Sequence, residues 1–99
     1  MCNNCSKIKT YIGFAKRSKN IIYGVDEIIK AIKKCEVIMV SSALAKSSLE
    51  KLQKIATKSK KNIYIVAESE FNNQLNSIFI KAIAITDKSL SDAIKKELD

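Results

Sequence analysis

Apolar residues three and four positions apart recur in five stretches of the chain, and this spacing predicts amphipathic helices that each bury one face. In the first stretch, Ile8, Ile12 and Ala15 lie on one side of such a helix, and polar residues occupy the other side. The same spacing follows Gly24, where Val25 and Ile28 begin the second stretch. The predicted helices span residues 6–16, 25–34, 47–60, 71–78 and 87–98.

Short apolar runs separate these helices and predict four strands, at residues 21–23, 36–41, 62–67 and 80–86. The run from Val37 to Val40 has no polar position, which is typical of a strand buried on both faces. Because short apolar strands alternate with helices, we predict an α/β fold, a three-layer α/β/α sandwich. The length of 99 residues fits a single domain over 1–99, with residues 1–6 expected to be irregular.

The chain carries 18 Lys and Arg residues against 10 Asp and Glu residues, a formal net charge of +8. This charge favours a polyanionic partner, nucleic acid above all. An alternative explanation for part of this positive charge is a codon bias toward A and T, because Ile, Asn and Lys are all abundant. No apolar run approaches the roughly 20 residues of a membrane span. No secretory signal is recognisable, so we expect a cytoplasmic protein that uses no membrane.

Catalytic and metal-binding patterns are absent from the sequence. The chain has no His, which excludes Ser-His and Cys-His dyads, and two glycines cannot form a phosphate-binding loop. Cys2 and Cys5 form a C-x-x-C motif, but Cys35 is the only other thiol, and zinc needs four ligands. We therefore predict no enzymatic activity, no metal and no cofactor. A third hypothesis is a metal or redox function for the cysteines. Stoichiometric zinc in the purified protein would support it.

The segment from Gly24 to Lys34 holds the most informative charges. Asp26 and Glu27 open the predicted helix, a placement that compensation of the helix dipole explains by itself. The spacing also puts Glu27, Lys30 and Lys34 on one stripe. A carboxylate there can accept hydrogen bonds from a guanine edge, and an ammonium one turn away can contact a base acceptor or a phosphate.

Five short motifs carry a family resemblance: GFAKR at 13–17, YGVDE at 23–27, KAI at 30–32, IMVSS at 38–42 and AITD at 84–87. In this order the chain resembles the kink-turn RNA-binding ribosomal proteins of the L-seven-Ae and L-thirty-e type, and their bacterial ribosomal-protein-like branch in particular. The resemblance covers about residues 7–97. It implies an α/β/α sandwich with a mainly four-stranded mixed sheet.

The resemblance also implies a function, recognition of a kinked RNA stem-loop with tandem sheared G·A pairs. The helix that starts at Gly24 would enter the RNA groove, where Glu27 would accept from guanine and Lys30 would contact a guanine acceptor or the backbone. Lys34 would contact phosphate. The loop over residues 67–70, with Ala67, Glu68 and Ser69, matches the family's second contact region, which covers an extruded nucleotide.

Two positions depart from the family pattern. Asp26 stands where kink-turn binders usually carry Asn, and the loop at 67–70 is acidic where the family has apolar side chains. The leading hypothesis is a non-enzymatic binder of structured RNA, ribosomal RNA included, with ribonucleoprotein partners. The alternative is a protein-interaction module of the same fold that has lost specific RNA recognition.

Overall fold

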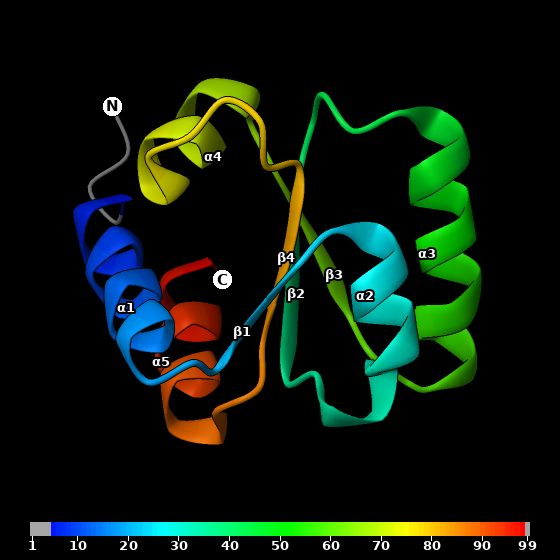
Figure 1. Ribbon diagram of the computed structural model, residues 1–99, viewed down its shortest axis with the longest axis horizontal. Helices are drawn as coiled ribbons and strands as arrows, with labels where there is room; N and C mark the ends of the chain where they lie inside the picture. Colours follow the sequence, from blue (N-terminus) through cyan, green and yellow to red (C-terminus); the bar gives the residue numbers. More distant parts are fainter. Residues whose placement is uncertain (1–4, 99) are drawn as a thin grey trace.

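The computed structural model describes residues 5–98, in which helices and strands alternate along the chain (Figure 1). All nine elements that the sequence predicts are present, with shifted ends. The helices of this part of the chain are α1 (Cys5–Arg17), α2 (Val25–Lys30), the 3₁₀ turn η1 (Ile32–Lys34), α3 (Lys46–Lys58), α4 (Glu68–Leu75) and α5 (Lys88–Leu98). The strands are β1 (Ile21–Tyr23), β2 (Val37–Ser41), β3 (Ile63–Val66) and β4 (Ala82–Ile85).

The four strands form one mixed sheet in the order β1-β4-β2-β3. β4 is antiparallel to both β1 and β2, whereas β2 and β3 are parallel. β1, β2 and β3 therefore run in one direction, and β4 runs against them. The three strands end at the same side of the sheet, and β4 begins at that side. We call this side of the sheet the carboxyl edge.

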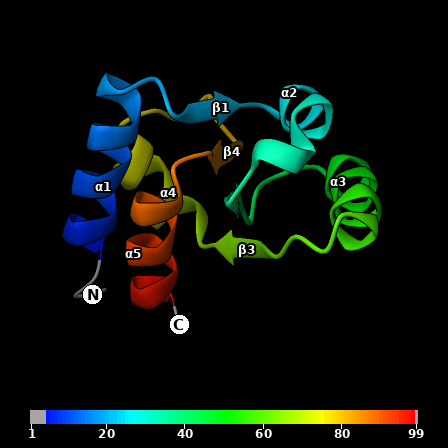
Figure 2. The ribbon, with the colours of Figure 1, turned by 90° about the horizontal axis from the view of Figure 1, so that it is seen from below.

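Helices cover both faces of the sheet, which confirms the three-layer sandwich (Figure 2). α1, α4 and α5 bury their apolar residues on one face, and α2, η1 and α3 on the other. β2 lies between the two layers and is buried along its whole length, as its apolar run predicts. Alternation along β4 divides its side chains: Ile83 and Ile85 enter the first core, and Ala82 and Ala84 the second.

α2 and α3 run parallel to each other because of their connections. Each helix follows a strand that ends at the carboxyl edge and leads into a strand that begins at the opposite edge. Both helices therefore start at the carboxyl edge and run back along the sheet. They lie side by side in both ribbon views (Figures 1 and 2).

The second predicted helix is shorter than its apolar periodicity suggests. α2 ends at Lys30, and the backbone of Ala31 leaves the helical conformation at φ −111° and ψ 24°. The N–H of Ala31 is shared between the carbonyls of Glu27 and Ile28, which tightens the last turn and leads into η1. The prediction of one continuous helix over 25–34 is wrong, and Lys34 belongs to η1.

The ends of α1 and α4 also differ from the prediction. α1 begins at Cys5, so residues 5 and 6 are helical, whereas 1–4, with Cys2, lie outside the described residues. α4 begins at Glu68 and ends at Leu75, because Asn76 adopts a left-handed conformation with φ 53°. The predicted helix over 71–78 is therefore displaced, and Ile78 lies beyond its end.

Candidate nucleic-acid interface

The carboxyl edge brings together the two predicted contact segments. Gly24 follows β1, and its N–H donates to the carbonyl of Ala82 at the start of β4 at 3.0 Å. Ala67 follows β3, which lies at the other side of the sheet. Three strand spacings of about 4.8 Å separate β1 from β3, or about 14 Å in all. The segments at 24–27 and 67–69 therefore share one edge.

Gly24 shapes the backbone in front of α2. Its φ of 89° lies in a region that residues with a side chain rarely adopt, and its carbonyl accepts from the N–H of Ile28 at 3.0 Å. A Cβ at this position would meet no atom within 4 Å. The backbone conformation alone therefore requires glycine, and the space before it is open.

The two adjacent carboxylates of α2 have different lysine partners. Lys51 of α3 donates to Asp26 Oδ1 at 2.8 Å, and Lys30 Nζ lies 3.2 Å from Glu27 Oε2. The hydrogen bond from Lys51, together with the charge of that ammonium, lowers the pKa of Asp26 below its ordinary value. Asp26 is thus an ionised, paired group whose negative charge is offset at the surface.

A third ion pair lies at the start of α4. Lys81 Nζ is 3.5 Å from Glu68 Oε2, and the N–H of Glu68 donates to Ser42 Oγ at 3.0 Å. Ala67 is the N-cap of α4, and Glu68 and Ser69 form its first turn. The prediction of a loop over 67–70 is therefore wrong beyond Ala67. The acidic residues extend the helix because they suit its first turn.

All three carboxylates of the candidate interface thus have a lysine partner. Their side chains are largely exposed, and exposed pairs of this kind contribute about 0–1 kcal/mol each. Their lysines can exchange a carboxylate for a phosphate at little cost. Lys34 does not continue the stripe of Glu27 and Lys30, because the helix ends before it.

Lys51 and Lys81, the ion-pair partners of Asp26 and Glu68, were not predicted from the sequence. Lys51 reaches Asp26 only because α2 and α3 lie on the same face of the sheet, and strand order, which decides this, is not readable from one chain. Lys81 reaches Glu68 because β4 runs against β3, a direction that its apolar run does not reveal.

An exposed apolar pair also adjoins this edge. Ile78 and Phe79 lie between α4 and β4, just before Lys81, and Phe79 is 86% exposed. The prediction placed Ile78 inside a helix, where its side chain would be partly covered. The helix ends early, so both side chains face solvent.

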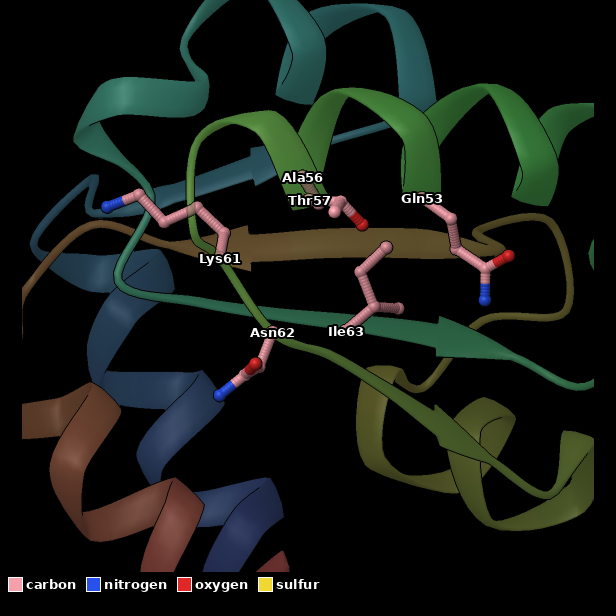
Figure 3. Close-up of a pocket in the computed structure, with 6 residues that line it drawn as sticks. All are labelled: Gln53, Ala56, Thr57, Lys61, Asn62 and Ile63. Carbon is pink, nitrogen blue, oxygen red and sulfur yellow. The ribbon is translucent and has the colours of Figure 1, made fainter.

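A shallow hollow lies between α3 and the start of β3, away from the carboxyl edge (Figure 3). Its volume is about 330 Å³. Figure 3 shows Lys61 and Asn62 extending in the opposite direction from Gln53, so the polar groups do not converge on one point. The residues that line the hollow are Gln53, Ala56, Thr57, Lys61, Asn62 and Ile63.

The buried thiol and the acidic side chains of residues 5–98 do not form a metal site. Burial raises the pKa of the Cys35 thiol, which donates to the carbonyl of Ala31 at 3.3 Å. Within these residues, no three His, Cys, Asp or Glu side chains lie close enough to hold a metal ion. None of the helices in the described part of the chain has the length and apolarity to cross a membrane.

Comparison with known proteins supports the fold. No family model and no curated protein matches the chain. A solved structure described as that of a protein with unknown function from Bacillus halodurans C is similar, with a TM-score of 0.83 and 17% sequence identity. The match covers 94% of this chain and 97% of that one. At this identity the likeness shows a shared fold over nearly the whole chain.

Proposed function

We propose that this protein is a non-enzymatic binder of structured RNA, which it contacts through the carboxyl edge. The observation that supports the proposal is the meeting of Gly24–Glu27 with Ala67–Ser69 at one edge of the sheet. The segment from Gly24 to Lys61, which includes α2 and α3, carries nine lysines against four carboxylates and so gives this layer of the molecule a positive charge. The sequence resemblance to kink-turn-binding ribosomal proteins points to a kinked stem as the RNA.

Glu27 and Lys30 have complementary roles in this proposal. A carboxylate repels phosphates and gains only from base donors, so Glu27 provides selectivity for a guanine edge. Lys30 neutralises Glu27 in the free protein at 3.2 Å and contacts a base acceptor or a phosphate in the complex. Lys51 holds Asp26, which reduces the repulsion that this carboxylate would otherwise exert on RNA.

The test compares affinity for a kink-turn RNA and for a straight duplex of equal length at about 150 mM salt, where nonspecific phosphate binding is weakened. We expect at least a tenfold preference for the kinked RNA, about 1.4 kcal/mol. Glu27→Ala should reduce this preference, and Lys30→Ala should weaken binding and flatten its salt dependence.

Glu50→Ala is the matched control, because it removes an exposed carboxylate of α3 outside the three ion pairs. It should leave the preference unchanged. Equal affinity of the native protein for both RNAs, or an equal effect of Glu27→Ala on both, would contradict the proposal.

Ile78 and Phe79 favour a second candidate function, a protein-interaction module. Two large apolar side chains, 63% and 86% exposed, are adjacent in sequence and lie beside the carboxyl edge. A protein partner, ribonucleoprotein components included, would bury them. Complexes that survive nuclease treatment and are lost in Phe79→Ala would support this function. Complexes that nuclease abolishes would support RNA binding instead.

A further inference from the structure

A second charged surface lies behind the carboxyl edge, on the face covered by α2, η1 and α3. We call it the lysine track and define it by Lys33 and Lys34 of η1 and Lys54 and Lys58 of α3. All four side chains are exposed. No carboxylate among residues 5–98 lies within ion-pair distance of any of them. The track therefore differs from the carboxyl edge, where each lysine named above is paired.

The register of α2 against α3 brings the four lysines of the track to one end of the molecule. The contact of 2.8 Å between Lys51 and Asp26 places the start of α2 beside the second turn of α3, so the end of η1 lies toward the end of α3. Lys54 and Lys58 follow Lys51 by three and seven residues, so they share its face, about 5 and 11 Å further along the axis. Lys33 and Lys34 follow Asp26 by seven and eight residues, in the 3₁₀ turn that comes after α2.

The four ammonium groups thus lie on neighbouring elements, toward the ends of η1 and α3. Axes of packed helices are typically about 8–10 Å apart. Glu36, directly before β2, is the carboxylate nearest to the track in sequence. Lys61, which follows α3, adds a further positive charge close to the buried Cys35. The like charges repel one another in the free protein, and a polyanion relieves this repulsion.

We infer that the lysine track binds the phosphate backbone of an RNA duplex, the stem that continues from the site at the carboxyl edge. This inference rests on the proposed function, since α2 and η1 connect the two surfaces. An RNA duplex suits the track better than an anionic membrane does. None of the exposed large apolar side chains of residues 5–98 lies on α2, η1 or α3, and membrane-surface helices need such side chains. A row of ammonium groups on a rigid helix fits the repeating charges of a backbone.

The experiment measures the salt dependence of binding to a straight RNA duplex. In the double variant Lys54→Gln and Lys58→Gln, the slope of log affinity against log salt concentration should fall by about 2, one for each lost phosphate contact. Affinity near 150 mM salt should fall roughly tenfold or more. The matched control is Lys88→Gln with Lys96→Gln, which removes two exposed lysines from α5 on the other face.

The preference for kinked RNA separates this inference from the proposed function. We expect the Lys54→Gln, Lys58→Gln variant to keep the preference of the native protein, because Glu27 is intact. If the native protein shows no preference, the proposed function fails, and the slopes on the straight duplex still test the track. An equal change of slope in both double variants, or none in either, overturns the inference. The inference is also overturned if the Lys54→Gln, Lys58→Gln variant loses binding to vesicles of anionic phospholipid while its salt-dependence slope on the straight duplex is unchanged.

Discussion

The two faces of the sheet have different cores and different surfaces. The face under α1, α4 and α5 is filled by large side chains, with Phe71 and Leu75 of α4 fully buried. The face under α2 and α3 includes small residues, Ala56, Ala82 and Ala84. The outer surfaces differ as well, since α3 carries four lysines against one carboxylate, and α5 three against two. One layer mainly supplies buried apolar area, and the other supplies the charged surface.

β4 produces this division because successive side chains of a strand point to opposite faces. Ile83 and Ile85 widen the first core, whereas Ala82 and Ala84 leave room for helices to approach the second face closely. The short α2 lies against this face and positions Glu27 and Lys30. Small residues under α2 thus allow the helix that carries Glu27 and Lys30 to pack closely on the sheet.

The largest effect should come from breaking the first core. Phe71→Ala should lower the free energy of unfolding by about 3–5 kcal/mol, because it removes a fully buried aromatic ring. Chemical denaturation measures the change, and the RNA affinity of the folded fraction should be unchanged. Phe79→Ala is the control and should have almost no effect on stability. Similar losses in the two variants would contradict the division between buried and exposed aromatic residues.

A moderate effect should come from filling the second core. Ala84→Leu should lower the free energy of unfolding by about 1–3 kcal/mol, since Ala84 is fully buried in the middle of the sheet. It should also displace α2 and reduce the preference for kinked RNA, a change that Phe71→Ala should not cause. Ala43→Leu, at an exposed position after β2, is the control for the added side chain. A neutral Ala84→Leu would show that this face has room to spare.

The smallest effect should come from separating Asp26 and Lys51. In Lys51→Ala, the pKa of Asp26 should rise toward its ordinary value, because the hydrogen bond and charge that lower it are lost. Since the folded-state pKa is lowered, the pair stabilises the native protein above the unfolded-state pKa of Asp, and this contribution disappears as the pH falls through the lowered value. NMR titration of the carboxyl carbon measures the shift. Lys58→Ala should leave Asp26 unaffected, and an unchanged titration in Lys51→Ala would exclude the ion pair in solution.

The predicted elements came from local patterns, and their errors have local causes. Periodicity through Ile28 and Ile32 predicted a helix as far as Lys34, but a 3₁₀ turn also buries Ile32. Ile78 has helical spacing from Phe71 and Leu75, yet the left-handed Asn76 ends α4 before it. The candidate interface was predicted within Gly24–Lys34 and at 67–69; Lys34 lies in η1, outside the helix that carries Glu27 and Lys30. The role of the interface in RNA binding stays a prediction.

By itself, the sequence determined the order and type of the elements, the excess of lysine and the absence of histidine chemistry. These properties depend on side chains close in the chain, whose spacing reports which face is buried. Only the tertiary structure decided the strand order, the pairing of Asp26 with Lys51 and of Glu68 with Lys81, and the alignment of the lysine track. These contacts join residues that the sheet brings together, and a strand's sequence does not specify its neighbour when several apolar strands could pair equally well.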